Sequence, residues 1–424
     1  MDQYASYTDS LIPYVGLIPS HWKTVQNKRV MHKEKRICTS YAGQDIISLT
    51  MNGVVIRDLG AGGKMPTTFD GYQFVYPGEL LMCLFDIDVT PRCVGKVYNE
   101  GLTSPAYSSF VLHDNADLGF YYYYYLMLDH TKELLPLAKN LRHSLTEEQL
   151  GQIKVPLPPL SEQRAIAEFL DAKIAHIDSV IAEAKASIEE YKAWKASIIY
   201  EAVTKGLDPN VEMKDSGVEW IGTVPTGWKL PRIKDIAIFM PKCDFSICTS
   251  ETPITFTPME CIRTGTFENR SKLFGEIEGT YTQYAEGDIV LAKVTPCFEN
   301  GNVCIMKQLY SGVGMGSSEL FVLRPTKIHD RYLLYVLQHS GFKDAACATM
   351  TGTGGLKRVS SSFIQNCHIP YPAISVQKRI ADYLDDKCSS ISNLIAEKET
   401  LISDLEAYKK SLIFEVVTGK RKVV

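Results

Sequence analysis

The sequence predicts an α+β fold in which two globular domains are separated by a pair of long helices that form an antiparallel coiled coil. Three observations lead to this fold class. One stretch of the chain occurs twice, and each copy carries apolar residues at alternating steps of three and four. Each copy also follows a region in which strand-like and helix-like patterns are mixed. Together these observations describe one structural plan that the chain uses twice.

The length and composition suit a protein of several domains. The chain has 424 residues, of which 45% are hydrophobic and 22% charged, and this length favours two or three domains. Apolar runs stay short of the roughly 18 residues that a membrane-spanning helix needs, and the first ten residues are polar, unlike a signal peptide. We therefore expect a cytoplasmic protein whose 11 cysteines are free thiols, because no CxxC pair occurs.

The overall charge argues against strong DNA binding by this chain alone. Its formal net charge is -4, whereas a lone DNA-binding domain is usually basic. A local basic segment nevertheless occupies residues 23–36 and includes Lys28 and Arg29. This segment is either a solvated surface or a place where phosphates bind.

The duplication is plain in the sequence. Residues 160–206 align without a gap to residues 374–420 at a constant offset of 214, and 19 of the 47 positions are identical. A second match lies upstream, where residues 18–23 (IPSHWK) parallel residues 224–229 (VPTGWK). Between these markers the two halves diverge. A constant frame around divergent centres indicates one scaffold that presents two different binding surfaces.

A proline-rich segment precedes each copy of the repeat, at residues 155–160 and 369–374. Prolines lack a backbone donor and favour extended geometry, so each helix should begin just after them, with Ser161 and Ser375 as N-caps. From there we expect helices of about 40 residues. Their apolar positions follow a heptad-like spacing, with Leu170, Ile174, Ile177 and Ile181 in the first and Leu384, Cys388, Ile391 and Ile395 in the second.

The narrow apolar stripe on each helix is typical of a coiled-coil seam. Because a whole domain connects the two helices, antiparallel pairing within the chain is the simplest arrangement. It would hold the two domains at opposite ends of a rod. The alternatives are that each helix packs only on its own domain, or that the coil forms between molecules.

The divergent domains read as α+β, because strand-like runs such as residues 79–84 and 288–292 alternate with helical runs such as residues 120–128 and 331–338. The first helical run contains five consecutive tyrosines, Tyr121–Tyr125. Tyrosines can stack on bases, but we favour a partly buried helix, since residues 332–335 (YLLY) repeat the pattern in the second half.

Several loops carry residue types that suit nucleic acid. Residues 57–64 and 351–358 are rich in glycine and carry cations, and residues 293–302 offer a cation, a carboxylate and two amides after a strand. Glycine permits close backbone approach, and these polar groups match base edges and phosphates. Each loop could equally be plain surface. The candidate DNA-binding residues are Lys28, Arg29, Arg57, Lys64, Lys293, Glu299, Asn300, Asn302, Lys357 and Arg358.

The sequence patterns of common enzymes are missing. Gly62, Gly63 and Lys64 are not followed by the Ser or Thr of a P-loop, and no HExxH or GxSxG occurs. The chain also lacks the Asx-Pro-Pro-aromatic tetrad with which adenine methyltransferases hold a flipped base. We therefore expect no catalytic site and no cofactor or metal held by this chain.

Residues 157–164 (LPPLSEQR) and 215–225 (DSGVEWIGTVP) resemble the conserved segments of the specificity subunits of Type I restriction-modification enzymes. The resemblance covers the whole chain in order and spacing, and the motifs are specific in combination. Departures are small. Val376 stands where the first copy has Glu162, and residues 15–18 match the segment that begins at Trp220 only in degenerate form.

The resemblance implies a non-catalytic DNA-recognition subunit. Two target-recognition domains would each read one half of a bipartite site in double-stranded DNA; the first is residues 1–155, and the second lies with a linker in residues 207–370. The helical regions, at residues 156–206 and 371–424 with a basic C-terminal tail, would act as a ruler and as docking surface for two methyltransferase subunits. Restriction subunits would complete the enzyme. S-adenosylmethionine, ATP and Mg would be bound by these partners.

Two other functions remain open from the residues alone. A stand-alone modification enzyme or nuclease would need a site assembled in space from scattered residues. A coiled-coil scaffold or adhesin would bind protein instead of DNA.

Overall fold

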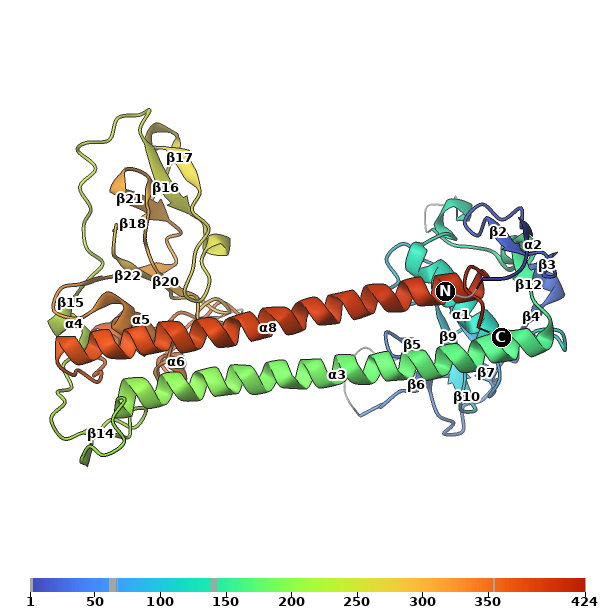
Figure 1. The fold of residues 1–424 in the computed structure, drawn as a ribbon, viewed down its shortest axis with the longest axis horizontal. Helices are drawn as coiled ribbons and strands as arrows, with labels where there is room; N and C mark the ends of the chain where they lie inside the picture. The colour runs from blue at the N-terminus through green and yellow to red at the C-terminus, as the bar shows by residue number, and fades with distance from the viewer. Residues whose placement is uncertain (1–2, 61–65, 67, 139–142, 354, 424) are drawn as a thin grey trace. The chain divides into compact units, whose positions relative to one another are not determined.

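Figure 1 shows the computed structural model of the protein, which describes residues 3–60, 66, 68–138, 143–353 and 355–423. The chain forms two compact units. The first joins Met1–Lys185 to Glu399–Val424, and the second is Ala186–Lys398. Each of the two long helices, α3 (Leu160–Lys205) and α8 (Ile374–Val417), therefore contributes one part to each unit.

The first unit is built on an antiparallel sheet with strand order β4-β11-β8-β9. All four residues of β8 are buried, as a central strand of apolar side chains should be, and helix α1 packs against β9. Four two-stranded pairs complete the unit: β1–β2, β3–β12, β5–β6 and β7–β10. The bounds are β1 (Tyr7–Asp9), β2 (Leu17–Pro19), β3 (Lys23–Gln26), η1 (Asn27–Arg29), β4 (Met31–Glu34), β5 (Ile47–Thr50), β6 (Gly53–Ile56), β7 (Gln73–Val75), β8 (Leu80–Cys83), β9 (Val94–Lys96), β10 (Gly101–Thr103), β11 (Tyr107–Leu112), α1 (Leu118–Thr131), η2 (Leu135–Leu137), α2 (Glu147–Gln152) and β12 (Lys154–Leu157).

The second unit contains a sheet of the same kind, with order β15-β22-β19-β20, and helix α5 packs against β20. It adds a second sheet, β17-β16-β21-β18, in which β16 and β21 are parallel, and a hairpin, β13–β14. The bounds are β13 (Met213–Asp215), β14 (Thr223–Pro225), α4 (Ile233–Ile236), β15 (Ala237–Phe239), β16 (Pro253–Thr257), η3 (Met259–Cys261), β17 (Ser271–Leu273), η4 (Phe274–Glu276), β18 (Thr282–Ala285), β19 (Ile289–Ala292), β20 (Val303–Ile305), η5 (Tyr310–Gly312), β21 (Val313–Gly316), β22 (Leu320–Pro325), α5 (Asp330–Gln338), α6 (Ser340–Cys347) and α7 (Ser361–Asn366).

The two principal sheets correspond strand by strand. In each, the first strand pairs with the last, and the last pairs with a buried middle strand that also pairs with the strand after it. A hairpin precedes each sheet, β1–β2 in one unit and β13–β14 in the other. The predicted duplication therefore includes the domains themselves, even where their sequences have diverged.

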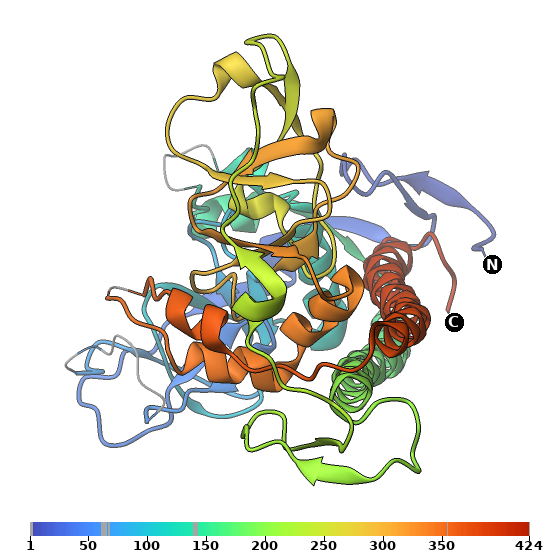
Figure 2. The ribbon, with the colours of Figure 1, turned by 90° about the vertical axis from the view of Figure 1, so that its left-hand side faces the viewer.

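The long helices pair with each other in antiparallel orientation, as predicted. In the first unit, the Asp178 carboxylate on α3 accepts from Lys409 Nζ on α8 at 2.6 Å. In the second unit, Lys195 Nζ on α3 donates to Ser392 Oγ on α8 at 2.8 Å. Figure 2 shows the two helices side by side at the second unit. Lys195 and Lys409 are equivalent residues of the repeat, and so are Asp178 and Ser392, so the same cross-seam contact occurs twice.

Each helix also packs on globular structure, and the core clusters show how. Ile166 and Leu170 from α3 share the first unit's core with Leu412 and Val416 from α8. In the second unit, Ile199 and Val203 from α3 lie in one core with Ile380 and Leu384 from α8. Each helix thus packs its N-terminal part on the domain that precedes it and its C-terminal part in the other unit. The idea that each helix packs only on its own domain is wrong.

The helices start two residues earlier than predicted, so Ser161 and Ser375 are not the N-caps. The α3 and α8 helices begin at Leu160 and Ile374, so Ser161 and Ser375 lie inside the first turn. The backbone N–H of Gln163 donates to the Pro159 carbonyl at 3.0 Å. Proline can occupy this position because only its carbonyl is needed there.

A buried glutamine ties each long helix to its domain. Gln163, which is 0% exposed, accepts from the backbone N–H of Asp117 at 2.8 Å and donates to the Pro158 carbonyl at 2.9 Å. Gln377, also 0% exposed, accepts from the N–H of His329 at 2.9 Å and donates to the Pro372 carbonyl at 2.8 Å. These residues are equivalent in the repeat. Asp117 and His329 are the N-caps of α1 and α5. Each glutamine therefore joins its long helix to the proline-rich segment before it and to the start of α1 or α5.

Within the part of the chain that the structure describes, no helix combines the length and apolarity needed to cross a membrane.

Candidate nucleic-acid interface

The candidate residues of the second unit come together at the end of strand β19. Lys293 directly follows this strand. Its N–H donates to the Glu319 carbonyl at 3.0 Å, and its carbonyl accepts from the N–H of Val359 at 2.9 Å. The next residue, Val294, forms an isolated antiparallel bridge with Arg358. The strand end therefore lies between the turn that precedes β22 and the glycine-rich segment 351–358.

A threonine fixes the glycine-rich segment against the strand end. The Thr295 hydroxyl donates to the Gly355 carbonyl at 2.8 Å and accepts from the Lys357 N–H at 3.0 Å. The Thr295 N–H donates to the Lys357 carbonyl at 3.0 Å. These three bonds give Lys357, an exposed residue, a defined backbone position although it lies in a loop.

Glu319 holds the guanidinium of Arg358 and lies near Lys293. Arg358 donates from Nε and Nη2 to the two Glu319 carboxylate oxygens at 2.9 and 2.6 Å. The Lys293 ammonium lies 3.9 Å from the same carboxylate and donates to the Ser318 carbonyl at 2.7 Å. The hydrogen bonds from Arg358 lower the pKa of the Glu319 carboxyl below its ordinary value. We call Lys293, Glu319, Lys357 and Arg358 the strand-end cluster.

The turn after the strand carries the remaining candidates of this half. The Phe298 and Asn300 N–H groups donate to the Val294 and Pro296 carbonyls at 2.9 and 3.0 Å, which forms a tight helical turn. Glu299 and Asn300 are exposed at its surface, whereas Asn302 is only 8% exposed. Asn302 is therefore the least accessible of the candidates that the structure describes.

The candidates of the first unit lie on separate elements. Lys28 and Arg29 are exposed in η1, which borders an open groove of about 620 Å³ whose walls also include His32, Lys33 and Glu147. Arg57 directly follows the β5–β6 hairpin, where its N–H donates to the Ile46 carbonyl at 2.7 Å. Lys64 lies outside the described residues.

The tyrosine run is structural, as we favoured. All but Tyr122 are buried in α1. Tyr121 donates to the Pro156 carbonyl at 2.9 Å, and Tyr125 donates to Asn27 Oδ1 at 2.5 Å. Tyr332 repeats the first of these bonds, to the Pro370 carbonyl at 3.0 Å. These rings are not available to stack on bases, but Tyr125 fixes the residue that precedes Lys28.

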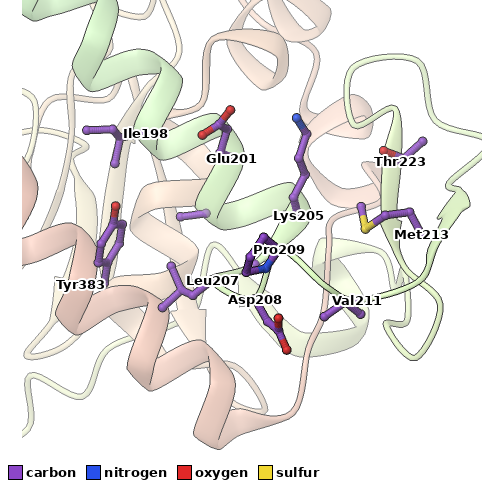
Figure 3. A pocket seen from close by; sticks show the side chains of 12 residues that line it. Ile198, Glu201, Lys205, Leu207, Asp208, Pro209, Val211, Met213, Thr223 and Tyr383 are labelled. Atoms are coloured by element: carbon purple, nitrogen blue, oxygen red, sulfur yellow. The ribbon is translucent and has the colours of Figure 1, made fainter.

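A further open groove, of about 770 Å³, lies at the end of α3 (Figure 3). Tyr383 from α8 and Met213 from the β13–β14 hairpin stand on opposite sides of it. Glu201, Lys205 and Asp208 are its charged residues. The described residues contain no cluster of His, Cys, Asp or Glu suited to a metal ion, and all 11 cysteines are free thiols.

The sequence did not indicate a role for Glu319, which belongs to the strand-end cluster, or for Thr295, which lies beside it. Glu319 and Thr295 acquire their roles through contacts with residues 39 and 60 positions away. The pattern of their neighbours carries no signal for such contacts. The glycine-rich segment 351–358 was the one visible sign, because it marks where backbone can approach closely.

Comparison with known proteins agrees with this architecture. A sequence model described as Type I restriction modification DNA specificity domain matches residues 93–190 and 225–403. The chain is 40% identical over 162 residues to the specificity subunit of the Type I restriction enzyme EcoEI of Escherichia coli, which is 37% of this chain and 27% of that protein. It is 35% identical over 198 residues to the EcoAI specificity subunit of the same organism, which is 46% of this chain and 33% of that protein. The matches thus span about a quarter to a third of these two relatives.

A solved structure shares the fold over nearly the whole chain. This structure was solved in work on the structural basis of complex assembly and conformational transition of the type I R-M system. It superposes on this chain with a TM-score of 0.70 at 15% sequence identity, and the superposition covers 94% of this chain and 98% of that one. Together with the duplicated sheets and paired helices, the family match agrees with the prediction of a non-catalytic specificity subunit. The chain belongs to the family of Type I restriction-modification DNA specificity domains.

Proposed function

We propose that this chain recognises a bipartite sequence in double-stranded DNA as the specificity subunit of a Type I restriction-modification enzyme. One observation carries the proposal: the chain keeps a repeated frame while the loops that the frame presents differ. The frame consists of the two principal sheets, the two glutamine contacts and the cross-seam lysines. Equal frames with unequal loops suit two readers of two different half-sites.

We take residues 1–155 and 207–370 as the two target-recognition domains. In the second, Lys293, Glu299, Asn300, Lys357 and Arg358 surround one strand end and provide both phosphate ligands and base-edge ligands. In the first, Lys28 and Arg29 beside their groove are suited to phosphates, and Arg57 extends the set. The net charge of -4 implies that partners supply much of the remaining phosphate contact.

The helical regions, at residues 156–206 and 371–424, would set the spacing of the half-sites and dock two methyltransferase subunits. Trp194 and Tyr408 support this role. They are equivalent positions of the repeat, and both are large aromatic residues left half exposed, at 50% and 48%. Exposed aromatic residues are favoured as anchors of protein interfaces. The groove near Tyr383 (Figure 3) would extend the surface in the second unit.

The chemistry would belong to the partners. Methyltransferase subunits would bind S-adenosylmethionine, and restriction subunits would use ATP and Mg, in the cytoplasm where the DNA lies. This chain would bind none of these cofactors itself.

Methylome sequencing of the host with and without this gene tests the proposal directly. We expect one bipartite methylated motif to disappear on deletion and to return when the gene is restored. Exchange of residues 207–370 for those of another specificity subunit should change one half of the motif and leave the other half unchanged. An unaltered methylome would refute the proposal.

The rival functions give different results in purified protein. Methylation or cleavage of DNA by this chain without a partner would support a stand-alone enzyme. A protein scaffold would bind the methyltransferase subunits but give no sequence-specific gel shift in their presence.

A further inference from the structure

The guanidinium of Arg358 is held from one side only. Its Nε and Nη2 donate to Glu319, which occupies the side edge of the planar group. A guanidinium has five N–H donors in a rigid fork. The end edge, formed by Nη1 and the second hydrogen of Nη2, therefore remains open, and the side chain is 48% exposed.

The two N–H groups at the end edge of an arginine guanidinium match the hydrogen-bonding edge of guanine. Two parallel N–H groups fit the O6 and N7 acceptors that guanine presents in the major groove, whereas adenine presents an acceptor beside a donor. The backbone of Arg358 is also fixed, by its bridges to Val294 and Thr351 and by 3.0 and 2.8 Å bonds between the Thr351 and Arg358 main chains. Both ends of the side chain are thus restrained before any DNA binds, which lowers the entropy lost on contact.

From this geometry we infer that Arg358 reads a guanine in the half-site of the second domain and that Glu319 is the positioning residue that aims it. The inference rests on the proposed function and deepens it to one base and one residue pair. Glu319 also limits the positive charge of the strand-end cluster, because Lys293 lies 3.9 Å from the same carboxylate. Glu319 thereby favours specific contact over general attraction to phosphates.

Removing the carboxylate should therefore separate affinity from specificity. In Glu319→Gln, Arg358 and Lys293 become free to turn toward phosphates. Affinity for the target should fall roughly 10- to 100-fold, the loss expected for one bidentate base contact. Affinity for unrelated DNA should hold or rise, and the slope of log K against log salt should steepen by about 1 for each of these cations that binds a phosphate. A residue with a purely structural role would not produce this divergence.

The test uses the full chain in complex with its methyltransferase subunits. Duplexes are first selected from a randomised pool with the wild-type complex. Binding is then measured by fluorescence anisotropy on the selected duplex, on poly(dA-dT), and on duplexes in which each guanine of the second half-site is replaced singly by 7-deazaguanine, which lacks N7. At one position, we expect the 7-deazaguanine replacement to lower the affinity of the wild type about 10-fold. At that same position the replacement should not lower the affinity of Glu319→Gln or Arg358→Lys any further.

A matched control lies elsewhere in the same unit. Arg232 donates from Nε and Nη2 to the Asp235 carboxylate at 3.0 and 3.2 Å on helix α4, so Asp235→Asn removes a similar exposed pair and should leave all DNA measurements unchanged. The inference is overturned if no guanine position responds, if Glu319→Gln keeps the wild-type response, or if Asp235→Asn matches Glu319→Gln. Failure to select any duplex would instead count against the proposed function. Arg358→Lys keeps the charge and the cluster, so it reports on guanine reading independently of Glu319.

Discussion

The two buried glutamines allow a sharp prediction about what holds each long helix to its domain. Gln377→Met keeps the length of the side chain but removes both hydrogen-bonding ends. The His329 N–H and the Pro372 carbonyl then lose partners that lie at 2.9 and 2.8 Å. A buried polar group without a partner costs about 1–3 kcal/mol. Two such groups give a range of about 2–6 kcal/mol, and we expect a loss of roughly 3 kcal/mol in the second unit, in the lower part of that range.

Hydrogen exchange followed by mass spectrometry is the suitable assay, because a chain with two units does not unfold in a single step. A loss of roughly 3 kcal/mol corresponds to about 100-fold faster exchange in the peptides that contain α5 and the start of α8. Peptides from α1 in the first unit should exchange as in the wild type. Gln163→Met should give the mirror result, with loss of protection in α1 and at the start of α3.

Gln365→Met provides the control, since this side chain makes only a 3.4 Å contact to the Ser361 carbonyl within its own helix and should cost less than about 0.5 kcal/mol. The reasoning is refuted if Gln377→Met behaves like this control. It is also refuted if either variant loosens α1 and α5 equally, because the effect would then not follow the hydrogen bonds.

Three further predictions follow from the described contacts. His339 is buried, and burial lowers its pKa to about 4. The neutral form is thus favoured in the folded state, so the second unit should lose up to about 3 kcal/mol as the pH falls from 6.5 toward 4. Thermal unfolding of wild type and His339→Asn at several pH values checks this, and equal pH dependence would contradict it. Ser392→Asp copies the first unit's cross-seam ion pair with Lys195 and should raise stability by about 0.5 kcal/mol, measured as slower hydrogen exchange in the second unit's part of α3 and α8; unchanged exchange would show that the lysine does not need a charged partner. Trp194→Ser or Tyr408→Ser alone should reduce the bound methyltransferase subunits from two to one, seen by mass photometry, with unchanged circular dichroism; a loss of both subunits or of neither would refute independent anchors.

The sequence predicted the frame well because the frame is local and repeated. Heptad spacing around Ile174 and Cys388 reports which side chains are buried in a helix pair, and both are buried. The proline segments located the helix starts to within two residues. The tyrosine helix was also predicted correctly, because the second half repeats its pattern.

The recognition surface was harder to predict because it is assembled from distant segments. Lys293 and Arg358 were both candidates, but their meeting at Glu319 depends on how the turn before β22 and the segment 351–358 flank one strand end. In the first unit, Arg57 and Lys28 do not meet at one strand end: Lys28 lies in η1, and Arg57 follows the β5–β6 hairpin. Those positions remain predictions.

The composition of the first unit has a consequence for the order of synthesis. Its core includes Leu412, Ile413, Val416 and Val417 from the far end of the chain, whereas the second unit is a continuous segment, Ala186–Lys398. A ribosome therefore releases all of the second unit before it has made the last part of the first. Residues 1–185 are translated before the second unit but obtain their full core after it, so a stop codon shortly after the codon for Lys398 would damage the domain that these earlier residues form.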